Sequence, residues 1–260
     1  MKTLLFANRK GGVGKTAIAC QFAYYLADTL GLRVLVIDAD HQGNTTKAVR
    51  ASGLFSVSDV TAGRIFAERI KAIENEKTVL IPSDELLIKM EKQPDKHNLF
   101  ATNLLSFLKS VDKLFDACLI DTNPNPDIRM TSALVSADFV LSPVQLNQEA
   151  LDGIGALAGD VKKVKSALNP KLHLVGILPN LVESTPFQKA NFAQLVALFP
   201  NLLIPLGKSH AFVKTRTAIA EAQAAGLPIW KLGKTSAADC WRELKPVFAK
   251  IAKVMEVNHA

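Results

Sequence analysis

Apolar residues gather in short runs, and the stretches between them alternate apolar and polar residues at helical spacing. The runs predict β-strands at Thr3–Asn8, Arg33–Asp40, Thr78–Ser83, Phe115–Thr122, Phe139–Val144, Leu172–Asn180 and Asn201–Pro205. Continuously apolar strands are typical of a sheet buried on both faces. Because helical patterns fall between most of these strands, we expect an α/β fold: a mostly parallel, twisted sheet covered by helices on both faces.

The chain of 260 residues, 48% of them hydrophobic, is long enough to bury the core of one large domain. We see no internal repeat and no low-complexity linker, so we expect a single domain over residues 1–260. The segment Ser52–Asn98 has the least regular pattern, and we expect it to be an inserted helical region.

Charge is distributed unevenly along the chain. Residues 1–150 carry 17 basic and 17 acidic side chains, whereas residues 151–260 carry 14 basic and 7 acidic ones, so the net charge of +7 comes from the last 110 residues. Such asymmetry favours a polyanionic partner, either nucleic acid or an anionic membrane surface. A mildly basic surface without a partner explains it equally well.

Neither a membrane-spanning run nor the pattern of a secretory signal is visible, so we expect a cytoplasmic protein. The three cysteines, Cys20, Cys118 and Cys240, are far apart in the sequence. Their number and spacing fit neither a disulfide framework nor a zinc cluster, and we expect buried thiols.

The stretch "FANRKGGVGKT" near the start has the composition of a phosphate-binding loop. Gly11, Gly12 and Gly14 allow the backbone to approach a phosphate, whose charge is bound by N–H groups at the start of the following helix. Lys15 can reach the β- and γ-phosphates, and the Thr16 hydroxyl can bind Mg²⁺. A strand before the loop and a helix after it, which this motif requires, are both predicted.

Two residues set this loop apart from the common pattern. A glycine is usual at residue 9, where this chain has Arg9, and a second lysine, Lys10, stands directly before the glycines. The loop is therefore a variant with Lys10 as its distinguishing residue.

Aspartates follow two of the buried strands. Asp38 and Asp40 end one strand, and Asp121 ends another. A single aspartate at a strand end is more often a helix cap or a turn former. Ligands of open parallel sheets bind at the carboxyl ends of the strands, however, and three carboxylates beside a phosphate loop predict a magnesium–nucleotide site.

The stretches "KGGVGKT", "VIDADHQGN" and "LIDT" resemble the deviant Walker-A ATPases of the ParA/MinD group. The D-x-D-x-Q-G-N stretch is most similar to ParA-type partition proteins. Later segments, "GILPN" and "IPLGKSHAFVKTRTAIAEAQAAGLPIW", extend the resemblance over nearly the whole chain. It implies a P-loop NTPase-like fold, ATP and Mg²⁺ as ligands, and a nucleotide sandwich dimer.

The resemblance also implies roles for single residues. Lys10 crosses to the nucleotide of the partner subunit, Lys15 holds phosphates and Asp40 orients the attacking water, which makes these three the catalytic residues. Thr16 binds Mg²⁺ directly, while Asp38 and Asp121 hold its water ligands. The nucleotide-binding residues are Lys10, Gly11, Gly12, Val13, Gly14, Lys15, Thr16, Ala17, Asn180 and Pro205, of which Asn180 and Pro205 lie near the adenine.

The chain departs from the family pattern at three places near the phosphates. His41 and Asn123 stand where proline is usual, and Ala17 stands where a second threonine is common. These departures affect the expected rate of hydrolysis and the response to a partner, not nucleotide binding.

ParA-type dimers bind DNA without sequence preference, and a ParB-like centromere-binding protein stimulates their hydrolysis. The resemblance therefore implies a bacterial, nucleoid-associated switch that segregates DNA. The DNA-binding candidates are Lys189, Lys208, Lys214 and Arg216, with Lys231 and Lys234 as weaker ones. Leu206 replaces the arginine that the family has there. A single basic residue of this kind is more often a plain solvated surface charge than a DNA contact.

A membrane-associated positioning ATPase of the MinD kind is the alternative. The last helical pattern, "CWRELKPVFAKIAKVMEV", places apolar residues on one face and lysines beside them, as in helices that lie on a lipid surface. A helix that docks its apolar face on the sheet has the same pattern. Pro246 is expected to start or kink this helix. We find no residues that support a metabolic kinase or an iron–sulfur protein.

Overall fold

The computed structural model describes residues 1–257, and only the backbone of residues 148–152. Within them, seven parallel strands form one sheet in the order β3-β4-β2-β5-β1-β6-β7. The strands are β1 (Lys2–Phe6), β2 (Val34–Ala39), β3 (Ser56–Val57), β4 (Thr78–Ile81), β5 (Ala117–Thr122), β6 (Phe139–Gln145) and β7 (His173–Asn180). The predicted α/β architecture is thus confirmed.

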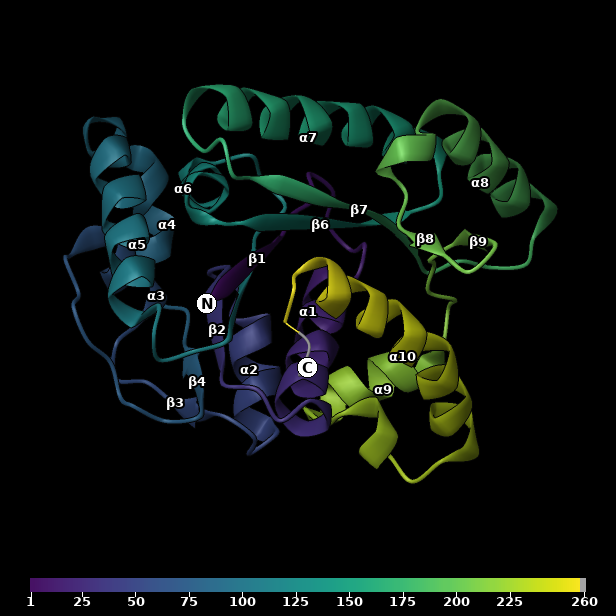
Figure 1. Cartoon of the computed structure of the whole chain (residues 1–260), viewed down its shortest axis with the longest axis horizontal. Helices are drawn as coiled ribbons and strands as arrows, with labels where there is room; N and C mark the ends of the chain where they lie inside the picture. Colours follow the sequence, from purple (N-terminus) through teal and green to yellow (C-terminus); the bar gives the residue numbers. More distant parts are fainter. Residues whose placement is uncertain (258–260) are drawn as a thin grey trace.

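Helices cover both faces of this sheet (Figure 1). One face carries α1 (Lys15–Tyr24), α2 (Asn44–Ala51), α9 (Thr217–Ala225) and α10 (Thr235–Val254), whose apolar residues share one core cluster with the sheet. The other face carries α3 (Ala62–Ala67), α4 (Leu86–Lys89), α5 (His97–Val111), α6 (Ile128–Ser136) and α7 (Gln148–Ala167). A smaller cluster of apolar side chains lies between α8 (Pro186–Leu198) and the strands β6 and β7.

Six of the predicted strands are present within a few residues of their expected bounds. The seventh, Asn201–Pro205, is wrong: Pro200–Leu202 forms a 3₁₀ turn, and Leu203 makes only an isolated bridge to Ile177. Pro205 instead opens a two-stranded antiparallel hairpin of β8 (Pro205–Leu206) and β9 (Ser209–His210). The prolines at both ends lack the N–H groups that a ladder needs, which explains why the apolar run does not join the sheet.

The segment 52–98 contributes β3 and β4 to the sheet, together with α3, α4 and two 3₁₀ turns. Helix α10 runs through Pro246 and begins eleven residues before it, so the expected start at this proline is wrong. Its apolar face is docked: Leu244, Phe248 and Ile251 are buried, and the Phe248 ring meets that of Phe22 at 5.3 Å. Cys20, Cys118 and Cys240 are buried free thiols, as predicted.

Candidate nucleotide and magnesium site

The glycine loop joins β1 to α1, as its sequence predicted. Gly12 and Gly14 have φ angles of 75° and 83°, in the left-handed region that favours glycine. A Cβ on Gly14 would lie 2.3 Å from Nδ2 of Asn180, so no larger residue fits there without a shift. No side chain of the described residues caps the first turn of α1, and that turn contains no acidic residue. The start of α1 therefore has the features of an anion-binding site.

Asn8 ties the loop to the sheet. Its side-chain amide donates to the carbonyl oxygen of Pro143 at the end of β6, and its Oδ1 accepts from the backbone N–H of Lys10 at 2.8 Å. The turn in front of the glycines is thus anchored by a buried side chain, which fixes the backbone where Lys10 leaves it.

A cavity of about 620 Å³ opens over this loop. Its volume is within the range of small-molecule sites. Besides Gly11, Gly12, Val13, Gly14, Lys15, Thr16 and Ala17, the lining consists of Asp40, Asn44, Lys47, Ala48, Ala51, Pro124, Gln223 and Ala224. The structure thus brings Asp40 together with the seven loop residues that the sequence proposed for nucleotide binding. Of the residues from α2 and α9, Asn44 belongs to the Q-G-N stretch, but none was proposed as a site residue from the sequence.

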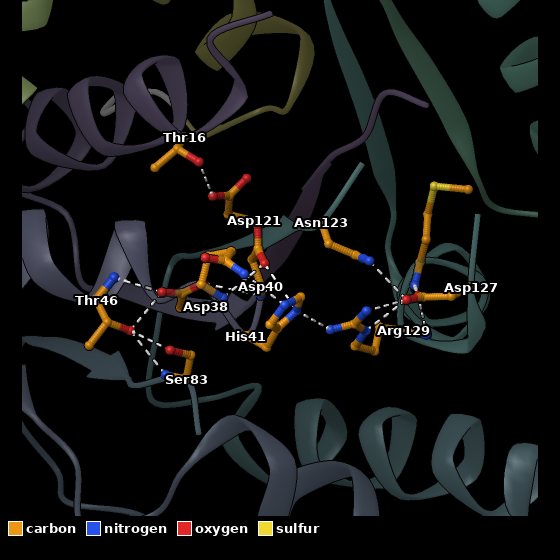
Figure 2. A network of polar contacts seen from close by, with 12 residues as sticks. Thr16, Asp38, Asp40, His41, Thr46, Ser83, Asp121, Asn123, Asp127 and Arg129 are labelled. Atoms are coloured by element: carbon orange, nitrogen blue, oxygen red, sulfur yellow. Dashed lines mark hydrogen bonds and ion pairs between the residues drawn. The ribbon is translucent and has the colours of Figure 1, made fainter. Parts of the chain in front are cut away.

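The aspartates meet at the edge of the sheet where the cavity lies. Asp38 on β2 and Asp121 on β5 are direct neighbours in register, and both are buried. The Thr16 hydroxyl donates to Oδ2 of Asp121 at 2.7 Å, and Figure 2 shows this pair above Asp38. Oδ1 of Asp121 is buried and finds no hydrogen-bond partner among the described residues. This oxygen and the Thr16 hydroxyl have the chemistry of Mg²⁺ ligands.

Two threonines that sequence reasoning missed complete this cluster. Thr45 donates from its hydroxyl to Oδ2 of Asp121 at 2.7 Å. Thr46 donates to Oδ2 of Asp38 from both its backbone N–H, at 2.7 Å, and its hydroxyl, at 2.6 Å. They directly follow the Q-G-N stretch, and adjacent hydroxyls beside paired carboxylates were the available signal. The threonines orient both carboxylates from the start of α2.

Burial sets the electrostatics of the cluster. It raises the pKa of Asp38 to about 7, with Asp121 adding to the shift and the Thr46 hydrogen bonds opposing it. Burial also raises the pKa of Asp121, against the hydrogen bonds from Thr45 and Thr16. Burial lowers the pKa of Lys15, although Asp121 and Asp40 act in the opposite direction. Two buried carboxylates side by side are unfavourable when both are charged, and a bound cation relieves this repulsion.

The donor set suits a magnesium ion that completes its shell elsewhere. Among the described residues, no three or more His, Cys, Asp or Glu side chains are arranged to hold a metal by themselves. Mg²⁺ is commonly bound by one or two carboxylates together with phosphate oxygens and waters. Thr16, Asp121 and Asp38 are thus the residues that would hold it, with Asp38 acting indirectly because its Oδ2 is taken by Thr46.

Asn180 and Pro205 are placed differently from the loop residues. Asn180 is buried at the end of β7 and donates from Nδ2 to the carbonyl oxygen of Val13 at 2.8 Å. Its Oδ1 has no hydrogen-bond partner in the part of the chain that the structure describes. Pro205 is exposed in the hairpin. In the described part of the chain, neither residue lines the cavity. Their contact with adenine stays a prediction.

The basic candidates lie on the C-terminal part, and most of them pair with acidic neighbours. Lys214 and Arg216 both contact Oε1 of Glu243, at 2.9 and 2.6 Å. Lys231 pairs with Asp28 at 2.8 Å and Lys234 with Glu221 at 2.6 Å. Lys189 on α8 and Lys208 in the hairpin turn are exposed. Lys189 and Lys214 line one surface hollow of about 230 Å³ together with Phe192 and Phe212.

Residues 1–174 match the AAA_31 family model, an AAA domain. The chain is 33% identical to Protein IncC of Escherichia coli, a match over 99% of this chain and 71% of that protein. It is 32% identical to the chromosome-partitioning ATPase Soj of Thermus thermophilus, over 70% of each chain. The chain belongs to the ParA-type partition ATPases. It is an ATPase that uses ATP and Mg²⁺.

Solved structures agree on the fold. Apo McdA from Cyanothece superposes with a TM-score of 0.78 at 23% identity, over 98% of this chain and 99% of that one. A plasmid partition protein from Borrelia burgdorferi bound to AMPPNP gives a TM-score of 0.73 at 21% identity, over 96% and 99% of the two chains. The P-loop NTPase-like fold expected for this ParA-type ATPase is thereby confirmed.

Proposed function

We propose that this ATPase is a switch that segregates DNA, in which ATP–Mg²⁺ joins two copies into a nucleotide sandwich dimer. The dimer binds DNA without sequence preference, and a ParB-like centromere-binding protein stimulates slow hydrolysis and release. The carrying observation is the loop: a cavity lined by Gly11–Ala17 and Asp40 opens directly after Lys10, whose backbone is anchored by Asn8. The switch would act in the cytoplasm, on the nucleoid of a bacterium.

Each site residue has a proposed part in hydrolysis. Lys15 and the N–H groups of the loop would hold the phosphates, and Thr16, Asp38 and Asp121 would hold Mg²⁺, which supplies positive charge against the phosphate oxygens. Asp40 would orient the attacking water from the cavity wall. Lys10 would reach the nucleotide of the partner subunit, where a cation supplied in trans makes hydrolysis depend on dimerisation.

The decisive experiment is fluorescence anisotropy of a random-sequence DNA duplex titrated with the protein. The titration is run with ATP–Mg²⁺, with ADP–Mg²⁺ and without nucleotide, each at two salt concentrations. Binding only with ATP, weakening steeply with salt because phosphate contacts release counterions, is the expected result. Equal binding in all three states, or none in any, would refute the switch.

Lys10→Ala tests the dimer. We expect normal binding of a fluorescent ATP analogue but no ATP-dependent dimer in light scattering, and hydrolysis at the background rate. Lys15→Ala is the matched comparison, since it should weaken nucleotide binding itself. A Lys10→Ala protein that dimerises with ATP and hydrolyses it normally would contradict the trans role.

The membrane alternative receives no support from α10, because the face that would enter the lipid is buried against α1 and the sheet. No helix among the described residues is long and apolar enough to cross a bilayer. Co-sedimentation with anionic liposomes in the presence of ATP is the direct test, and we expect the protein to stay in the supernatant.

A further inference from the structure

His41 and Asn123 are two positions at which this protein departs from its family. They lie at the two ends of one network of hydrogen bonds and an ion pair (Figure 2). Asn123 donates from Nδ2 to Oδ2 of Asp127 at 2.9 Å, and Asp127 pairs with the guanidinium of Arg129. Nη1 of Arg129 lies 3.2 Å from Nδ1 of His41. This network thus connects the loop after β5 to His41, the residue that follows Asp40.

Arg129 is the residue of this network whose side chain is held most firmly. Its side chain is 7% exposed and that of Asp127 is 8% exposed, so the ion pair is buried. Asp127 also caps α6, accepting from the backbone N–H groups of Arg129 at 2.9 Å and Met130 at 3.3 Å. A carboxylate with this many donors holds a guanidinium in one place. The donor presented to His41 therefore has a position set by the helix.

The hydrogen bonds around His41 define its ring orientation. A guanidinium only donates, so Nδ1 of His41 accepts from Arg129, and the ring proton is on Nε2. Nε2 of His41 lies 2.8 Å from Nε2 of the Gln42 side chain. Because two donors would then face each other, the Gln42 amide is assigned in the flipped orientation, in which its oxygen accepts the ring proton. The ring is thus held on both sides, while its backbone continues from Asp40.

The contacts of His41 and Gln42 fix the position of the neighbouring Asp40. Its Oδ1 lies 3.6 Å from Nδ1 of His41 and accepts from the backbone N–H of Gln42 at 3.0 Å. Asp40 lines the cavity and is 14% exposed. A proline at position 41 would stiffen this loop through its fixed φ angle. His41 instead fixes the loop through contacts of its side chain.

We propose that His41 is a positioning residue for ATP hydrolysis. Its hydrogen bond from Arg129 holds the loop 40–42 so that the Asp40 carboxylate stays at the cavity wall. The inference rests on the proposed function, in which Asp40 orients the attacking water. It further makes the loop after β5, through Arg129, part of what sets the hydrolysis rate.

Steady-state ATP hydrolysis by His41→Ala and His41→Asn tests the idea. We expect kcat of His41→Ala to fall about five- to tenfold, the worth of one well-placed hydrogen bond, while KM for ATP stays within about twofold. His41→Asn should recover kcat to within about threefold, because the amide oxygen of asparagine can take the acceptor place of Nδ1. A purely structural role would not produce rescue together with an unchanged KM.

Arg129→Lys and His41→Ala together form a double-mutant cycle. Lysine keeps a cation beside Asp127, which avoids leaving a buried carboxylate unpaired, but it lacks the fork that contacts Asp127 and His41 together. We expect Arg129→Lys to lower kcat in the wild-type background and to have no further effect in the His41→Ala background. Additive losses would overturn the pairing of these two residues.

His173→Ala is the matched control, since His173 is an exposed imidazole at the opposite end of the sheet. Asp40→Asn distinguishes a failure of the role proposed for Asp40 from a failure of the role inferred for His41. A normal rate for Asp40→Asn overturns the proposed role of Asp40 and this inference with it. A slow Asp40→Asn beside a His41→Ala protein with unchanged kcat, or a His41→Asn protein as slow as His41→Ala, overturns this inference alone.

Discussion

At the scale of single residues, Gly14 carries the strongest geometric demand in the site. Alanine there has to adopt a φ angle of 83°, and its methyl group meets the amide of Asn180. We expect Gly14→Ala to lose about 2–4 kcal/mol of folding stability, from backbone strain and overpacking together. Thermal melting without nucleotide measures it.

Gly11→Ala is the matched control for that loss. The φ angle of Gly11 is not in the left-handed region, and the nearest atom to an added Cβ is 3.9 Å away, on Pro124. Its melting temperature should stay within about 2 °C of the wild type. Equal losses in the two variants would show that Asn180 does not press on the loop.

Asp38 gives the nucleotide-free protein a specific pH dependence. Its pKa in the folded chain is about 7, above the ordinary value near 3.9 of an unfolded aspartate. Between these values only the folded chain holds the proton, so stability falls as the pH rises from about 4 to about 7. We expect Asp38→Asn, which cannot become charged, to gain several degrees of melting temperature over the wild type between pH 5 and pH 7.5.

The same melts with ATP–Mg²⁺ provide the control. A bound cation compensates the charge of Asp38 and Asp121, so the advantage of Asp38→Asn should shrink or reverse at pH 7.5. A difference between the two proteins that is independent of pH without nucleotide would show that Asp38 is charged throughout this range.

At the scale of elements, α10 decides between a docked helix and a membrane-binding one. We expect Phe248→Ala to cost about 3–5 kcal/mol, because it empties a fully buried site against Phe22. Lys245→Ala, on the exposed side of the same helix, should change stability by less than about 0.5 kcal/mol. Equal melting temperatures for both variants would mean that the helix does not contribute to the core.

Strands and helices could be predicted from the sequence better than the side-chain contacts between them. Fully apolar runs that end in aspartate correctly predicted β2 and β5, and the rule that parallel strands end at one edge placed Asp38 beside Asp121. The strand predicted at Asn201–Pro205 does not form because this short apolar run lies between Pro200 and Pro205, which lack the N–H groups that a ladder needs. The contact between His41 and Arg129 joins residues 88 positions apart, and no periodicity or motif marks it.

At the scale of the whole molecule, the basic excess of the C-terminal part is smaller in effect than its count indicates. Glu243 lies between Lys214 and Arg216 and offsets part of their charge. If these cations face DNA in the ATP-bound dimer, that carboxylate opposes binding. Glu243→Gln should then tighten DNA binding severalfold at low salt and steepen its decrease with salt, since more cations are available to phosphates.

Glu256→Gln is the matched control, because it removes the same charge from a pair with Lys2, at the end of α10. At about 0.1 M salt it should leave DNA affinity within about twofold. Glu256 follows Glu243 by 13 residues, about 20 Å along a helix, which exceeds the Debye length of about 10 Å. If both variants tighten binding equally, net charge alone controls affinity, and the surface around Lys214 and Arg216 is no defined DNA site. If neither does, DNA contacts lie elsewhere, and the exposed Lys189 and Lys208 become the residues to replace.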